Sequence, residues 1–203
     1  MPDSSIFKMD HHFLDCENMI SYIPNALTQQ ERLGLKSLIA NSDLVQPSLR
    51  IFGNRPKFYD TTFNRGTVPS SHYSQTIMTP EAALFSILIR SKYTSPLYPN
   101  EANDHFNCNL VHYSPDLANG GRRGKHQDNP DQPLTLVLIY SYGQDRTMTF
   151  YKGNRKVHRA TLAHNSILVM EGPSFQNVYH HQLDPLKKGI VAQDRYSFNT
   201  RYM

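Results

Sequence analysis

Three side chains in the second half of the chain have the types and spacing needed to hold one metal ion. His126 and Asp128 are two positions apart, so on an extended strand they project to the same face. A later histidine, His180 or His181, lies in an apolar segment. Two imidazoles and one carboxylate form the facial triad of non-haem Fe(II) oxygenases, but the same donors also suit a hydrolytic zinc ion. These residues predict a metal centre and leave redox and hydrolytic chemistry open.

Two arginines near the C-terminus provide a reason for an anion beside that metal. Arg195 and Arg201 are six positions apart and therefore project to one face of a strand, together with Ser197 and Asn199. A guanidinium can bind a carboxylate through two parallel hydrogen bonds, so a dicarboxylate co-substrate beside a metal would satisfy both arginines. The alternative is an exposed edge strand with scattered cations.

The composition sets the size of the protein that must position these residues. The chain has 203 residues, 38% hydrophobic and 19% charged, which is typical of one globular domain. Two cysteines are too few for a disulfide framework. The longest apolar run, around residues 134–139, is far shorter than the roughly 20 residues of a membrane span. We expect a soluble, intracellular monomer of the cytoplasm or nucleus, whose net charge of +4 permits a polyanionic partner.

Two helices are expected in the N-terminal half. After a short strand at residues 21–23, Thr28 and Glu31 form the Thr-x-x-Glu pattern of a capping box. The apolar face of the helix that follows is expected at Leu33, Leu35, Leu38 and Ile39. A second helix has Thr79 as its N-cap and Pro80 as its first residue, and its inward face is expected at Leu84, Ile87 and Leu88.

From residue 107 onward, short β-rich runs alternate with turn signals. The runs are expected at residues 134–142, 148–151, 156–162, 166–170, 176–182 and 196–203. Residues 143–145 and 153–154 are expected to form hairpin turns. The pattern predicts a mainly β protein with flanking helices (α+β), built on a sandwich or jelly roll. One domain is expected over residues 1–203, with helices and substrate-recognition loops in 21–106 and the catalytic core in 107–203.

The order of these motifs resembles that of the AlkB-like branch of the 2-oxoglutarate/Fe(II) dioxygenases over about residues 21–203. Residues 22–25 look like the family's N-terminal segment, and residues 106–113 look like its strand ahead of the metal site. His126-x-Asp128 is similar to the family's metal motif, and Arg195-x5-Arg201 completes the pattern. The resemblance implies a double-stranded β-helix (jelly roll) that binds Fe(II), with 2-oxoglutarate and O2 as co-substrates.

Carried onto this sequence, the resemblance makes His126, Asp128 and His180 the iron ligands. His180 is preferred to His181 because the step from Tyr179 to His180 matches the family's aromatic-histidine pair. Arg195 would bind the distal carboxylate of 2-oxoglutarate, Arg201 would contact its metal-proximal end, and the hydroxyl of Tyr113 would lie in the same pocket.

Three positions depart from the family pattern. Val111 stands where the family often has Asn, so a hydrogen bond is either missing or supplied by Asn109 on the same strand face. Pro130 replaces a common acidic residue, for which Asp131 is a candidate substitute, and Ser197 replaces a common Asn. The change at Pro130 affects substrate recognition, whereas Ser197 weakens one contact to the co-substrate without removing the paired arginines.

The resemblance implies oxidative removal of N-alkyl groups, such as methyl, from nucleobases in DNA or RNA, with release of formaldehyde, succinate and CO2. The target base must leave its stack, which calls for aromatic surfaces and for cations that hold phosphates. Phe58 and Tyr59 are candidates for stacking, and Arg122, Arg123 and Lys125 are candidates for phosphate contacts. The alternatives are a hydroxylase or demethylase of a protein side chain or small metabolite, and a binding protein that has lost turnover.

Overall fold

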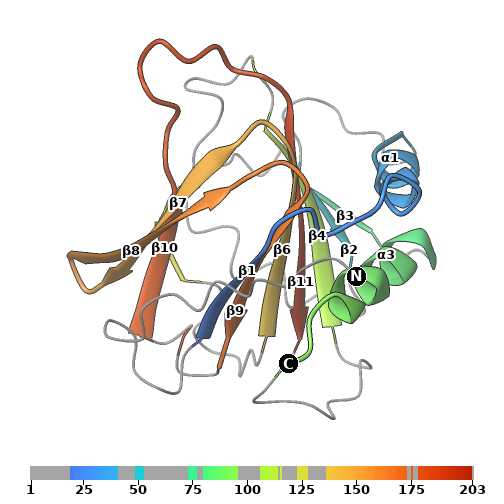
Figure 1. The fold of residues 1–203 in the computed structure, drawn as a ribbon, viewed down its shortest axis with the longest axis horizontal. Helices are drawn as coiled ribbons and strands as arrows, with labels where there is room; N and C mark the ends of the chain where they lie inside the picture. The colour runs from blue at the N-terminus through green and yellow to red at the C-terminus, as the bar shows by residue number, and fades with distance from the viewer. Residues whose placement is uncertain are drawn as a thin grey trace.

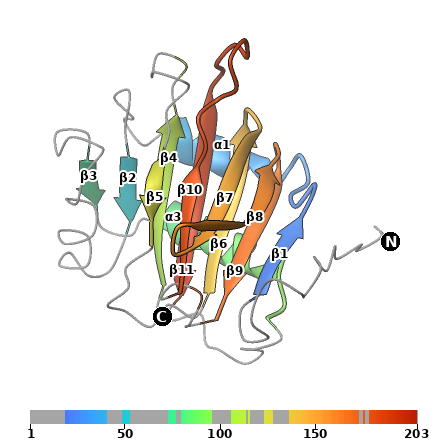
Figure 2. The ribbon, with the colours of Figure 1, turned by 90° about the vertical axis from the view of Figure 1, so that its left-hand side faces the viewer.

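Two β-sheets face each other, and two helices cover the outer side of the larger sheet (Figures 1 and 2). The computed structural model describes residues 19–40, 49–52, 73–76, 80–95, 106–113, 115, 123–127, 136–172, 175 and 178–202. The larger sheet contains, in spatial order, β1 (Met19–Ile23), β9 (Ser166–Glu171), β6 (Leu136–Gly143), β11 (Arg195–Tyr202), β4 (Phe106–Tyr113), β2 (Leu49–Phe52) and β3 (Tyr73–Thr76). The smaller sheet contains β5 (Arg123–His126), β10 (Tyr179–Leu183), β7 (Arg146–Lys152) and β8 (Arg155–Leu162). The helices are α1 (Arg32–Ala40) and α3 (Pro80–Ser91).

The strand β11 of the larger sheet is buried on both faces, and its side chains alternate between two different environments. In β11, the polar residues Arg195, Ser197, Asn199 and Arg201 face the space between the sheets. Phe198 and Tyr202, on the other face, pack with the helices. Among the described residues, the strand therefore has no solvent-exposed face, and its arginines are enclosed inside the protein.

Two separate cores hold these layers together. The core between the sheets is built from apolar residues of both, among them Val137, Ile139, Met148, Phe150, Leu168 and Tyr179. The core under the helices joins α1 and α3 to the larger sheet and includes Leu35, Leu38, Phe85, Ile89, Leu110, Tyr140 and Phe198. The core between the sheets does not fill the whole space between them. The polar residues of β11 face the part that these apolar side chains leave open.

The start of α1 agrees with the expected capping box. The backbone N–H of Thr28 donates to Glu31 Oε2 at 2.8 Å, and the N–H of Glu31 donates to Thr28 Oγ1 at 3.2 Å. The two side chains thus satisfy two backbone donors that the helix cannot satisfy itself. Leu35 and Leu38 are buried as expected, whereas Leu33 is 47% exposed.

The apolar face of α3 is only in part the expected one, since Leu88 packs against the core under the helices but Leu84 and Ile87 do not. Its buried residues are Ala82, Phe85, Ser86 and Ile89, whereas Leu84 and Ile87 are 67% and 46% exposed. The ring of Phe85 lies edge-on to the rings of Tyr140 and Phe198, with centroid distances of 5.7 and 4.9 Å. Both stripes have helical spacing, so the partner sheet selects between them.

The turn at residues 143–145 is also different from the expectation. It does not close a hairpin, because it carries the chain from β6 in the larger sheet to β7 in the smaller one. The turn at Gly153 and Asn154 does join two paired strands, β7 and β8, as expected. Sheet membership depends on pairing partners that are distant in the sequence, which turn residues do not encode.

Candidate active site

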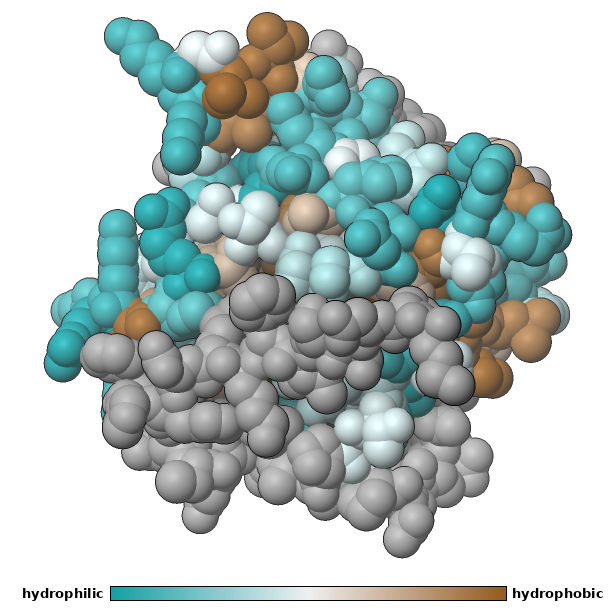
Figure 3. Space-filling model, in the orientation of Figure 1, coloured by the Kyte–Doolittle hydropathy of each residue, from teal (hydrophilic) through white to brown (hydrophobic). Residues whose placement is uncertain are grey.

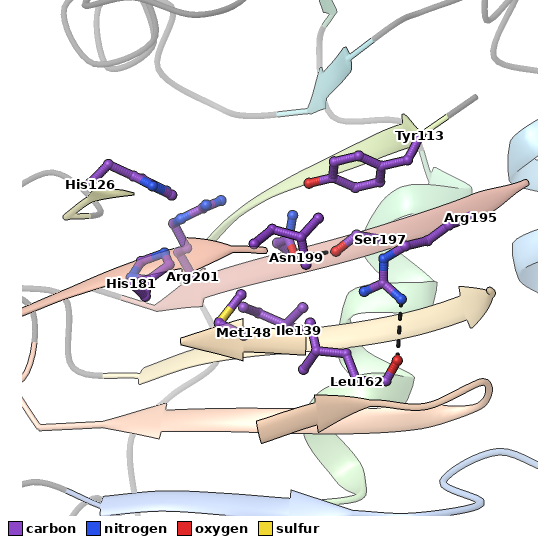
Figure 4. A pocket seen from close by; sticks show the side chains of 11 residues that line it. Tyr113, His126, Ile139, Met148, Leu162, His181, Arg195, Ser197, Asn199 and Arg201 are labelled. Carbon is purple, nitrogen blue, oxygen red and sulfur yellow. Dashed lines mark hydrogen bonds between the residues drawn. The ribbon is translucent and has the colours of Figure 1, made fainter. Parts of the chain in front are cut away.

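A pocket opens between the two sheets, where the polar face of β11 meets the smaller sheet (Figure 4). Its polar lining residues are Tyr113, His126, His181, Arg195, Ser197, Asn199 and Arg201. Its apolar lining residues are Ile139, Met148, Leu162 and Leu183. The pocket therefore brings together the first metal-motif histidine, both C-terminal arginines and the tyrosine that the sequence singled out.

The imidazole rings of His126 and His181 lie next to each other in this pocket (Figure 4). The two residues are paired across β5 and β10, and their ring centroids are 4.3 Å apart. His126 Nδ1 lies 2.7 Å from the carbonyl oxygen of Gly124, which can only accept, so Nδ1 is the protonated nitrogen. In a neutral ring, this hydrogen bond makes Nε2 the nitrogen that can bind a metal.

His180 does not share the pocket, and the preference for it over His181 has to be corrected. Tyr179, His181 and Leu183 are buried, whereas His180 and Gln182 are only partly buried. The side chain of His180 lies on the outer face of β10, where burial and the nearby Lys125 ammonium lower the pKa of its imidazole. The flanking apolar residues Tyr179 and Leu183 were a usable sequence signal, since residues two apart on a strand face the same way.

Arg195 is held rigidly at one end of the pocket (Figure 4). Its Nη2 donates to Ser141 Oγ at 2.9 Å, and its Nη1 donates to the carbonyl oxygens of Gln144 and Leu162 at 3.1 and 3.4 Å. Burial lowers the pKa of Arg195 to about 10, so the guanidinium remains charged at neutral pH. Its Cζ lies 5.9 Å from the centroid of the Tyr113 ring.

A chain of hydrogen bonds orders the polar residues between the two arginines. Ser197 Oγ donates to Asn199 Oδ1 at 2.7 Å, and Asn199 Nδ2 donates to Asn109 Oδ1 at 2.5 Å. Asn109, the cross-strand partner of Asn199 on β4, is fully buried and is not a lining residue of the pocket. It holds Asn199 from the neighbouring strand, while Val111 packs against the core between the sheets.

A sequence model of the 2OG-Fe(II) oxygenase superfamily matches residues 20–201, which include all of the lining residues. The chain belongs to the 2OG-Fe(II) oxygenase superfamily. Oxygenases of this superfamily use Fe(II), with 2-oxoglutarate and O2 as co-substrates. A search of curated protein sequences finds no match to the chain.

Solved structures confirm the expected jelly-roll fold. OsALKBH1 is similar with a TM-score of 0.56 at 16% identity, over 91% of this chain and 96% of that chain. A prolyl hydroxylase from Trichoplax adhaerens, in complex with a hypoxia inducible factor oxygen degradation domain peptide fragment, is similar with a TM-score of 0.54. Its identity is 14%, over 92% of this chain and 83% of that chain. At such low identities the likeness concerns the fold.

The charges in the pocket of this oxygenase fit a dicarboxylate. Arg195 and Arg201 are both buried, and none of the lining residues in the described part of the chain is Asp or Glu. Two enclosed guanidiniums are stabilised most by an anion with two carboxylates, because each can then receive charge-assisted hydrogen bonds. His126 and His181 could hold iron next to that anion.

Several expected site residues cannot be placed. Asp128, Phe58, Tyr59 and Arg122 lie outside the described residues, and of Arg123 only the backbone in β5 is described. No cluster of three metal-ligating side chains occurs within the described residues, which leave out Asp128. No helix in the same part of the chain is long and apolar enough to cross a membrane.

Gly143 fixes the backbone position of Arg195, and its replacement by alanine is expected to be strongly destabilising. Gly143 has a φ of 99°, and a Cβ atom there would lie 2.2 Å from the carbonyl oxygen of Asp194. We expect Gly143→Ala to lower the free energy of unfolding by about 3 kcal/mol, from backbone strain and overpacking together. Urea denaturation followed by circular dichroism measures this change.

Gly153→Ala is the matched control, because Gly153 also has a positive φ, 57°, but no atom lies within 4 Å of an added Cβ. Only backbone strain remains there, at about 1–2 kcal/mol. Equal destabilisation by the two substitutions would show that the contact with Asp194 has no effect.

Proposed function

We propose that this oxygenase removes N-alkyl groups, above all methyl groups, from nucleobases in DNA or RNA. The observation that carries the oxygenase part is the pocket that joins His126 and His181 to Arg195 and Arg201. The nucleobase part is supported by the AlkB-like order of the motifs and by the likeness to OsALKBH1. A cation, Lys125, is exposed next to His126 on the same strand and adds a phosphate contact to the proposal.

In this proposal His126, His181 and Asp128 hold the iron, with His181 in the place first assigned to His180. When bound by these residues, iron would supply, together with 2-oxoglutarate and O2, the oxidant for a C–H bond of the N-methyl group. One oxygen atom enters the methyl group and the other enters succinate, while CO2 leaves. The C–N bond then breaks, the hydroxymethyl group leaves as formaldehyde, and its hydroxyl proton passes to the freed nitrogen.

The other lining residues bind the co-substrate and exclude water in this proposal. Arg195 binds the distal carboxylate of 2-oxoglutarate, at the end of the pocket where its guanidinium is fixed by three hydrogen bonds. Arg201 holds the end near the metal, and Tyr113 lines the pocket close to Arg195. Ile139, Met148, Leu162 and Leu183 form an apolar wall that excludes water and strengthens these charged contacts.

Formaldehyde release from methylated oligonucleotides tests this proposal. We expect the iron-loaded protein to release formaldehyde from N-methylated DNA or RNA in a 1:1 ratio with succinate, and only when 2-oxoglutarate is present. Unmethylated oligonucleotides of the same sequence are the substrate control, and the His181→Ala variant is the enzyme control. Consumption of 2-oxoglutarate without release of formaldehyde from any methylated DNA or RNA would exclude nucleobase demethylation.

A protein side chain or a small metabolite is the second candidate substrate. The Trichoplax prolyl hydroxylase, whose solved complex contains a peptide, has a TM-score of 0.54, close to the 0.56 of OsALKBH1. Succinate production stimulated by a peptide or metabolite library, with no response to methylated oligonucleotides, would support this candidate instead.

A further inference from the structure

The smaller sheet carries a concentration of positive charge that the pocket does not use. Its four strands contain seven Lys and Arg residues, two in β5, two in β7 and three in β8, and no Asp or Glu. The chain as a whole has 21 basic and 17 acidic residues. The sheet that holds both pocket histidines thus accounts for much of the net charge of the protein.

Cross-strand pairing places several of these cations on the outer face of the sheet. His180 pairs with Tyr151, and Tyr151 pairs with Lys156, so all three side chains share the face opposite to His181. Lys125 lies on the same outer face, since its neighbour His126 points into the pocket. In the next row, Thr149 pairs with Arg159.

These cations are exposed, and Lys125 is bonded to neutral atoms. Lys125 Nζ donates to the carbonyl oxygen of Gly153 at 2.5 Å and to Asn154 Oδ1 at 3.2 Å. It also lies 5.1 Å from the centroid of the Tyr151 ring. Arg159 forms an ion pair with Asp184 at 3.2 Å, with 59% of its side chain exposed. In Figure 3, long hydrophilic side chains project on the side where Figure 1 shows the β7–β8 hairpin.

We propose that this basic face, defined by Lys125, Tyr151, Lys156 and Arg159, binds the phosphate backbone of a nucleic acid. The identity of the polyanion rests on the proposed function. Lys125 is adjacent to His126 in β5, so a backbone on this face lies about one sheet thickness, roughly 10 Å, from the pocket. The exposed cations would exchange counterions for phosphates, and Tyr151 offers an aromatic ring beside them.

An anionic membrane surface fits this face less well. Peripheral membrane binding uses apolar side chains that enter the lipid together with the cations. The exposed large hydrophobic side chains of the described residues are Leu33, Leu84, Ile87, Ile190 and Val191. None of them belongs to the four strands of the smaller sheet, so the face offers charge without an apolar anchor.

The test compares two triple variants with the same change in charge. Lys125→Gln/Lys156→Gln/Arg159→Gln neutralises the basic face. Lys36→Gln/Lys187→Gln/Lys188→Gln removes three exposed cations elsewhere, from α1 and from the loop after β10. Fluorescence anisotropy with a labelled, unmethylated single-stranded 20-mer measures binding between about 50 and 200 mM salt, the range over which phosphate contacts change affinity most. Melting temperatures check that both variants fold.

We expect the basic-face variant to bind at least tenfold more weakly at the lowest salt concentration. Its slope of log K against log salt should be smaller by about two, because each lost phosphate contact removes about 0.7. The control variant should bind within about threefold of the wild type. Equal loss in the two variants, or no loss in the basic-face variant, would overturn the proposal, as would wild-type binding to phosphatidylserine vesicles but not to the 20-mer.

A second measurement separates this inference from the proposed function. A methylated mononucleoside has no phosphate backbone, so its turnover should be unchanged in Lys156→Gln/Arg159→Gln, which keeps Lys125 beside His126, while KM for the methylated 20-mer rises. If no methylated substrate is turned over but the 20-mer still binds through the basic face, the proposed function fails and the inference stands. If demethylation is observed and the variant keeps the wild-type KM and affinity for the 20-mer, the inference alone fails.

Discussion

Replacing His181 by alanine is expected to abolish iron binding and to reduce turnover by at least about 1000-fold, because a lost ligand removes several kcal/mol of metal-dependent stabilisation. His181 is 3% exposed and lies against His126 in the pocket, with ring centroids 4.3 Å apart. Titration with Co(II), followed by its visible absorption bands, reports ligand loss without any assay of activity.

His180→Ala is the matched control, because it removes the same group one position earlier. The side chain of His180 lies on the outer face of β10, next to Lys125, so its loss should change metal affinity and turnover by less than about threefold, as is typical of a surface substitution. If His180→Ala removed the Co(II) bands and His181→Ala preserved them, the assignment of the pocket histidine would be incorrect.

Replacing Arg195 by methionine is expected to weaken 2-oxoglutarate binding by about 100-fold, because removing one partner of a buried charge pair costs about 2–5 kcal/mol. The guanidinium is completely enclosed, and its three hydrogen bonds to Ser141, Gln144 and Leu162 aim it at a fixed point. Isothermal titration calorimetry of the Co(II)-loaded protein measures the affinity. Arg195→Lys keeps the charge but not the paired donors. Its affinity for 2-oxoglutarate should therefore lie between those of the wild type and Arg195→Met.

Binding of 2-oxobutyrate is the control that makes this result specific to the distal carboxylate. The affinity for 2-oxobutyrate, which lacks that carboxylate, should be the same in the wild type and in Arg195→Met. An equal loss of affinity for both ligands would mean that Arg195 acts on pocket structure.

Burial lowers the pKa of Arg195 to about 10, and the bound carboxylate favours its charged form. The affinity for 2-oxoglutarate should therefore decrease as the pH rises through about 10, where the guanidinium loses its proton.

Arg195→Met weakens ligand binding, but it should not lower the stability of the protein without 2-oxoglutarate. A charge enclosed without its anion is unfavourable, and methionine fills much of the same volume, so the melting temperature without ligand should be unchanged or higher. The increase in melting temperature on adding 2-oxoglutarate should disappear. Destabilisation of the free protein by the substitution would show that Arg195 is mainly a structural residue.

Local patterns in the sequence predicted the features that depend on neighbouring residues. Thr28 and Glu31 form the expected capping box because both partners lie within one turn. Arg195, Ser197, Asn199 and Arg201 all line the pocket, because alternation along a single strand fixes which side chains share a face. The jelly-roll class followed from the spacing of short strands and from the order of the motifs.

The tertiary structure decided the points at which local patterns allowed two readings. His180 and His181 are both on β10, and the pairing of that strand with β5 and β7 places His181 against His126. In α3, two stripes of apolar residues have helical spacing, and contact with Tyr140 and Phe198 selects the one that contains Phe85. The sequence by itself determined which groups are available for chemistry and the period with which they repeat. The phase of that period was decided by the tertiary structure, because burial against distant strands is the interaction that distinguishes one face from the other.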